Sequence, residues 1–130
     1  MLGWYTEGHT MNEVLLNKTE LLILLLEEAR EKFASRGEEA PDFFSEVKPF
    51  ADKVRDTCDE WLPLAEEFAN RTRANYIHGS QISAAAENLQ SLSISALQPD
   101  MRERRFKDLA SSVEYVLHQL RDGLKQDQTK

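Results

Sequence analysis

The sequence predicts an all-α protein, an up-down-up-down four-helix bundle with short loops. In four separate segments, apolar residues recur at steps of three and four, the spacing of one face of an α-helix. No segment sustains the strict alternation of a half-buried strand. Short connections favour antiparallel neighbours. Pro63 lies inside the second apolar segment and removes a backbone donor, so we expect a kink or break there.

The four segments span about residues 11–36, 49–74, 80–97 and 101–125. A chain of 130 residues can bury roughly two-thirds of its extended surface, enough for one core without metal or disulfide support. The predicted core positions are Leu15, Leu22, Leu25, Ala29 and Phe33; Phe50, Val54, Cys58, Trp61, Ala65 and Phe68; Ile82, Ala85, Leu89, Leu92 and Ala96; and Phe106, Leu109, Ala110, Val113, Val116, Leu117, Leu120 and Leu124.

Helix-breaking and capping residues separate the segments. Gly37 is expected to close the first helix, residues 42–47 could form a single turn, and Pro49 suits the first position of the second helix. His78 or Ser80 could cap the third helix.

Before the fourth segment, Pro99 and Asp100 mark the break between helices. Asp100 with Glu103 three residues later resembles an acidic capping box. We therefore expect Asp100 to cap the fourth helix.

The first ten residues differ from the rest of the chain. They contain Trp4, two glycines and His9 without a helical period, whereas a clean helical pattern begins at Met11. We expect residues 1–10 to be a disordered arm or a non-native extension, and residues 11–130 to form a single domain. The composition of residues 1–10 leaves both alternatives open.

Composition favours a cytoplasmic protein. The net charge of −7 argues against general affinity for nucleic acid or anionic membranes. A single cysteine, Cys58, cannot form an internal disulfide, and we expect it to be a buried core thiol. The longest apolar run, Leu21 to Leu26, is too short for a signal-peptide core or a membrane-spanning helix.

That same apolar run is wider than a bundle helix requires, because it is apolar all around the helix for more than a turn. One explanation is a broad core contact covered by Phe43 and Phe44. The other is an outer face that contacts a second subunit or another protein. The candidate interaction face consists of Leu21, Ile23, Leu24, Phe43 and Phe44.

A basic run, Arg102, Arg104, Arg105 and Lys107, begins the fourth helix and opposes the helix dipole. An internal match with acidic residues at the same end would compensate for it. The acidic residues in question are Glu27, Glu28, Glu31, Glu38, Glu39, Asp42 and Glu46. Alternatively, Arg102, Arg105 and Lys107 could hold a phosphate at the helix start.

A second polar group is predicted at the opposite end of the bundle. It contains Arg71, Arg73, Tyr76, His78 and Gln81. If His78 caps the third helix, Gln81 could accept a hydrogen bond from its amide. The alternative for Arg73, Tyr76, His78 and Gln81 is ligand binding.

Recognisable catalytic and metal motifs are absent from the sequence. There is no Glu-x-x-His pair, His-Glu-x-x-His motif, Gly-rich phosphate loop or Gly-x-Ser-x-Gly elbow. Glu114, His118 and Asp122 share a helix face, a spacing that favours side-chain pairing over a weak metal site. We predict no catalytic residue, no cofactor and no metal.

Several short motifs, in their order and spacing over about residues 11–125, resemble the YppE-like family of small bacterial proteins. The motifs are Asp42-Phe43-Phe44, Val47-Lys48-Pro49, Trp61, Tyr76-Ile77-His78, Gln81-Ile82, Arg105-Phe106-Lys107-Asp108, Tyr115 and Leu117-His118. The resemblance implies an all-helical bundle from Gram-positive, Bacillus-like bacteria, without an established biochemical function. Pro63 departs from the family pattern, which puts the straightness of the second helix in doubt.

The favoured function is a non-enzymatic cytoplasmic interaction or adaptor protein, with an unknown protein partner or a second copy of the chain. The alternative is a protein that binds a small molecule or phosphate at the basic clusters. An enzyme of an unrecognised kind ranks last. We expect neither nucleic acid nor membrane as a partner.

Overall fold

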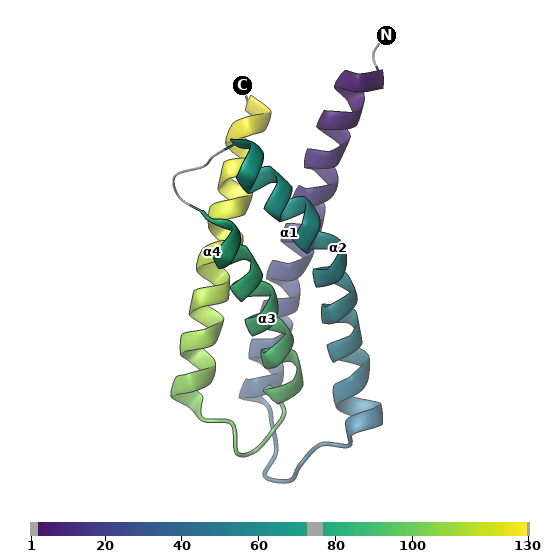
Figure 1. Ribbon diagram of the computed structural model, residues 1–130. Helices are drawn as coiled ribbons and strands as arrows, with labels where there is room; N and C mark the ends of the chain where they lie inside the picture. Colours follow the sequence, from purple (N-terminus) through teal and green to yellow (C-terminus); the bar gives the residue numbers. More distant parts are fainter. Residues whose placement is uncertain (1–2, 73–76, 130) are drawn as a thin grey trace.

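Four antiparallel helices form an up-down-up-down bundle, as the sequence predicts (Figure 1). The computed structural model describes the backbone of residues 3–72 and 77–129, and the side chains of residues 11–72 and 77–126. Within these ranges the elements are α1 (Gly3–Ala34), a π-helical turn η1 (Phe43–Val47), α2 (Lys48–Thr72), α3 (Gly79–Ser95) and α4 (Glu103–Thr129). Each helix packs against the next, and α4 packs against α1.

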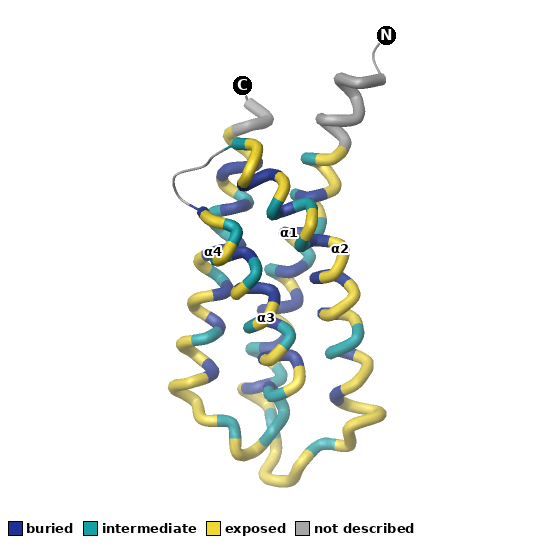
Figure 2. Tube along the Cα trace, viewed as in Figure 1, coloured by how far each residue is buried: buried dark blue, intermediate teal, exposed yellow. Residues whose placement is uncertain are grey.

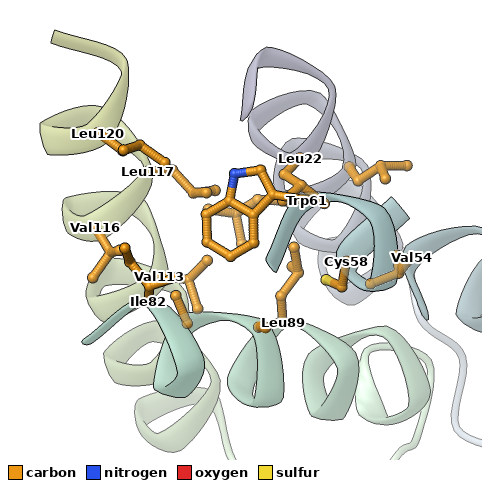
Figure 3. Close-up of a cluster of buried hydrophobic side chains, with 14 of the residues drawn as sticks. Leu22, Val54, Cys58, Trp61, Ile82, Leu89, Val113, Val116, Leu117 and Leu120 are labelled. Atoms are coloured by element: carbon orange, nitrogen blue, oxygen red, sulfur yellow. The ribbon is translucent and has the colours of Figure 1, made fainter. Parts of the chain in front are cut away.

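The predicted core positions face the interior, where all four helices meet (Figure 2). Every one is buried except Leu109, which is half-buried at the edge of the core. Trp61 of α2 lies at the centre of this core, surrounded by side chains from α1, α3 and α4 such as Leu22, Leu89 and Leu117 (Figure 3). This placement confirms the helical register predicted for the second segment.

One buried polar contact accompanies Trp61. Its indole Nε1 donates a hydrogen bond to Thr19 Oγ1 of α1, at 3.0 Å. Thr19 Oγ1 in turn donates to the carbonyl oxygen of Leu15, at 2.7 Å. The threonine hydroxyl thus satisfies the one polar atom of the tryptophan side chain, which sits where water cannot reach.

Helix α1 begins at Gly3, before Met11, where the apolar pattern starts. An established helix gains a backbone hydrogen bond for each added residue, so it can extend beyond the part that packs on the core. The apolar pattern marks only that packed part. That residues 1–10 are a non-native extension stays a prediction.

Helix α2 is continuous through Pro63, and its axis changes direction between its lower and upper parts (Figure 1). A helical proline lacks one hydrogen bond and crowds the preceding turn, which bends a helix without necessarily ending it. Pro63 is exposed, so the missing bond faces solvent and not the core.

The first part of α2 continues directly from η1, which places Pro49 second in the helix, whereas the sequence predicts the first position.

The predicted cap of the fourth helix is wrong. α4 begins at Glu103, and the first helical bond runs from the Phe106 amide to the Arg102 carbonyl, at 2.9 Å. Arg102 therefore occupies the N-cap position, while Asp100 lies in the preceding turn. Gln98 closes that turn by accepting a hydrogen bond from the Met101 amide, which moves the helix start beyond Asp100.

Candidate functional site

One group of the candidate residues lies at the end of the bundle that we call the loop end, whereas Leu21, Ile23 and Leu24 lie along α1 and His78 and Gln81 lie at the opposite end. The loop end consists of the α1–α2 connection with η1, the α3–α4 connection and the first turn of α4 (Figure 1). Two adjacent aromatic side chains are exposed there: Phe43 is 50% exposed and Phe44 is 75% exposed. Their rings contact each other edge to face, with centroids 5.3 Å apart.

Reciprocal hydrogen bonds fix the turn that carries this aromatic pair. Asp42 Oδ2 accepts from the Ser45 amide at 2.9 Å and from Ser45 Oγ at 2.7 Å, and these bonds lower the pKa of Asp42. The Asp42 amide donates to Glu46 Oε2 at 2.7 Å, a reciprocal bond similar to that of a capping box but made by the residue one position later in the turn. Val47, the one buried residue of η1, anchors the turn in the bundle. The two phenylalanines are thus exposed on an ordered turn.

An acidic hollow of about 480 Å³ lies in the same connection. Glu38, Glu39 and Glu46 line it, together with Arg36 and Leu97. Glu38 and Glu39 are exposed, and neither forms an ion pair within the described part of the chain. Their charges are therefore available to a group from outside.

The predicted match between the basic run and these acidic residues is wrong. Among the described side chains, Arg102, Arg104 and Arg105 form no ion pair or hydrogen bond, and all three are exposed. Lys107 pairs one turn back with Glu103, at 2.7 Å, which lowers the pKa of Glu103. Farther along α1, Glu27 and Glu28 pair with Arg30 and Lys32 of their own helix. Local pairs therefore take the place of the predicted long-range ones.

A second cavity, a cleft of about 610 Å³, lies between the end of α1 and the start of α4. Arg30, Arg36 and Lys107 line it, whereas Arg102 and Arg105 do not. The stacked rings of Phe33 and Phe106, whose centroids are 4.1 Å apart, also form part of the lining. Of the three residues predicted to hold a phosphate, only Lys107 reaches this cleft.

Arg36, which the sequence analysis did not single out, connects the two loops. Its guanidinium lies 3.6 Å from the centroid of the Phe33 ring and donates to the carbonyl oxygens of Phe33, at 2.8 Å, and Met101, at 3.3 Å. A cation there also complements the C-terminal end of the α1 dipole. The spacing of three residues from Phe33 was a weak signal for this contact.

Arg30 makes a bidentate contact across the α1–α4 interface. Its two terminal nitrogens donate to the Glu114 carboxylate at 3.2 and 3.3 Å, and one also donates to Glu27 at 2.6 Å. The hydrogen bond from Arg30 lowers the pKa of Glu114. Glu114 is thus engaged in side-chain pairing, and no group of His, Cys, Asp and Glu in the described ranges could hold a metal ion.

At the opposite end, the capping prediction is confirmed. His78 occupies the N-cap position of α3, and its amide donates to Gln81 Oε1 at 2.9 Å. Arg71 pairs with Glu67 at 3.4 Å and donates to Asn12 Oδ1 at 3.1 Å. Arg73 and Tyr76 lie outside the described residues, so the predicted ligand group cannot be assembled from this structure.

The candidate interaction face does not form one continuous surface. Leu21 and Ile23 are half-buried and pack against the core, whereas Leu24 is 65% exposed. Residues two apart on a helix diverge, so Leu21 and Ile23 lie on opposite flanks of Leu24. Phe43 and Phe44 do not cover this run, because η1 packs on α2 and both rings are exposed. The aromatic pair and Leu24 are thus separate features.

Cys58 is buried between α2 and α3, as predicted. Burial raises the pKa of its thiol to about 12, which removes the thiolate needed for nucleophilic chemistry near neutral pH. None of the helices, as far as they are described, is long and apolar enough to cross a membrane.

Comparison with known proteins places this fold in a bacterial family. Residues 19–124 match the bacterial domain of unknown function DUF1798. The Bacillus subtilis protein YppE, itself uncharacterised, is 26% identical over 122 residues, which cover 92% of this chain and 99% of YppE.

Two solved structures agree closely with the bundle. A crystal structure of a Listeria innocua protein of unknown function has a TM-score of 0.87 and 31% identity, covering 93% of this chain and 98% of that one. The crystal structure of B. subtilis YppE has a TM-score of 0.84 and 27% identity, covering 91% of this chain and 98% of that one. The match over residues 19–124, together with these likenesses, shows that the chain belongs to the DUF1798 family of YppE-like bacterial proteins.

Proposed function

We propose that this protein is a non-enzymatic cytoplasmic interaction protein that binds a protein partner at its loop end. The observation that carries the proposal is the exposed Phe43–Phe44 pair on a turn fixed by hydrogen bonds. Aromatic side chains contribute most to binding when a partner removes them from water. Cys58 is the one cysteine of the sequence and is buried and free, so the fold uses no internal disulfide, as is usual in a reducing compartment.

The turn itself explains why these aromatics suit binding better than folding. Val47 anchors the turn in the bundle, and Phe43 and Phe44 remain exposed, so neither ring contributes its full area to the core. Because Asp42, Ser45 and Glu46 already hold the turn, a partner would not have to order it. Preorganisation of this kind lowers the entropic cost of association.

Site-specific photo-cross-linking in living cells tests the proposal. Benzoylphenylalanine replaces Phe44 in one variant and Tyr115 in a matched control, since Tyr115 is 53% exposed but lies on α4 away from the loop end. We expect a discrete protein adduct from position 44 and none from position 115. No adduct at position 44, or equal adducts at both positions, would contradict the proposal.

The Phe43→Ser/Phe44→Ser variant shows whether the aromatic rings themselves are required. With the cross-linker moved to Ala40, an exposed and uncharged residue of the same connection, the adduct should disappear in this variant. The free energy of unfolding should stay within about 1 kcal/mol of wild type, since both rings are exposed. An undiminished adduct in a folded variant would assign the contact to some other feature of the loop end.

A second candidate is anion binding in the cleft between α1 and α4. Its volume of about 610 Å³ and the side chains of Arg30, Arg36 and Lys107 favour this alternative. Titration with inorganic phosphate, followed by amide chemical shifts, tests it. Saturable shifts at Lys107 and Ser111 that vanish in Lys107→Gln but persist in Arg105→Ala are expected for a site in the cleft; linear shifts throughout would exclude it.

A further inference from the structure

We propose that the partner at the loop end is a second copy of this chain, paired through a twofold axis. This inference rests on the proposed function and names its partner. It starts from the charges that the fold leaves without ion pairs among the described residues: Glu38 and Glu39 on one side of the loop end, and Arg102, Arg104 and Arg105 on the other, where the three arginines outnumber the exposed Asp100.

These two charged sets lie at the same end of the bundle but do not neutralise each other. The acidic set belongs to the α1–α2 connection, and the basic set belongs to the α3–α4 connection and the first turn of α4 (Figure 1). Arg36 lies between the connections, where it is held by the Phe33 ring and the Phe33 and Met101 carbonyls. The loop end therefore presents an acidic half and a basic half.

A surface divided in this way is complementary to itself. A twofold axis in the plane of the loop end, perpendicular to the line from the acidic to the basic half, places each acidic half on the partner's basic half. The same attractive contact then occurs twice, as isologous interfaces require. Other rotations oppose like charges, so electrostatics also selects the orientation.

The aromatic pair fits the same arrangement. Phe43 and Phe44 follow the acidic half in the chain, so in the pair they approach the partner's arginines. Stacking of a guanidinium on a phenylalanine ring already occurs in this fold, between Arg36 and Phe33 at 3.6 Å. A partner that is basic throughout would instead bring its charge against Arg102, Arg104 and Arg105, which favours a second copy over such a partner.

Sedimentation equilibrium with charge-reversed variants tests the inference. The wild type, Glu38→Lys/Glu39→Lys and Arg104→Glu/Arg105→Glu are compared over a wide concentration range at an ionic strength of about 0.15 M. The wild type should reach a monomer–dimer equilibrium. Each variant alone opposes like charges at both contacts, so its dimer Kd should rise at least about tenfold. An equimolar mixture of the two variants restores both attractive contacts and should dimerise again.

Two controls separate this result from unfolding or a different interface. Circular dichroism should show unchanged helicity, because the reversed side chains are exposed. Leu24→Glu alters the exposed apolar residue on the side of α1 and should leave the dimer Kd unchanged. A dimer lost in Leu24→Glu but kept in both charge variants would move the interface to α1 and overturn the inference.

The remaining outcomes distinguish this inference from the proposed function. A wild type that stays monomeric at the highest concentration, or a mixture of variants that fails to dimerise, overturns the self-pairing. If position 44 then cross-links to a different protein, the interaction function stands with another partner. If position 44 cross-links to nothing, both proposals fail.

Discussion

At the scale of single residues, the contact between Trp61 and Thr19 links burial to hydrogen bonding. Thr19 is the acceptor for the indole N–H in a region without access to water, and it still donates to Leu15. Thr19→Val retains the shape of the side chain and removes the acceptor. It should lower the free energy of unfolding by about 1–3 kcal/mol, the cost of leaving a buried donor unpaired. Urea denaturation measures this difference.

The same pair provides an internal control. Trp61→Ala should cost about 3–5 kcal/mol because it opens a cavity in the centre of the core. Thr19→Val/Trp61→Phe leaves neither polar partner behind, so its cost should be smaller than the sum of the costs of Thr19→Val and Trp61→Phe measured separately. Strict additivity would show that the hydrogen bond does not connect the two side chains.

At the scale of helices, Glu114 connects α4 to α1 through its bidentate contact with Arg30. Both side chains are partly exposed, so Glu114→Gln should cost only about 0.2–1 kcal/mol at pH 7. The hydrogen bond lowers the pKa of Glu114 in the folded state. Its stabilisation is therefore complete above the unfolded pKa of about 4.3 and is lost as pH falls through the lowered folded pKa.

Thermal unfolding over a range of pH checks this dependence. The difference in stability between wild type and Glu114→Gln should be present at neutral pH and shrink in acid below the folded pKa. Glu31→Gln removes an exposed charge from α1 that forms no ion pair among the described residues, so it should show no such change. A difference that persists unchanged into acid would assign the effect to packing.

The inner faces of the helices could be predicted because the apolar spacing of each helix repeats over several turns. One misplaced residue would therefore not shift the predicted register. The helix ends depend on single contacts. Arg102, and not Asp100, is the N-cap of α4, because the turn closed between Gln98 and Met101 places the helix start after Asp100. The apolar spacing of the sequence contains no signal for that turn. Likewise, the bend of α2 was predictable from Pro63, whereas the start of α1 at Gly3 was not.

The candidate site was harder to predict than the fold, for a physical reason. Composition indicated opposite charges at one end of the bundle, but pairing requires that long side chains meet within a few ångströms. Lys107 pairs with Glu103 of its own helix. Arg104 and Arg105 form no ion pair among the described residues. Arg36 acts through the Phe33 ring and two backbone carbonyls, contacts that depend on how the loops meet.

At the scale of the whole molecule, the buried residues of all four helices form one continuous hydrophobic cluster around Trp61. No helix can detach from the bundle without exposing part of this cluster to water, so the monomer should unfold in a single cooperative transition. Trp4→Phe leaves Trp61 as the one tryptophan, whose fluorescence then reports on the core. Fluorescence and far-ultraviolet circular dichroism should give the same urea midpoint and slope. An earlier fluorescence transition with helicity retained would mean that the core loosens before the helices melt, and that the bundle is less cooperative than its continuous core implies.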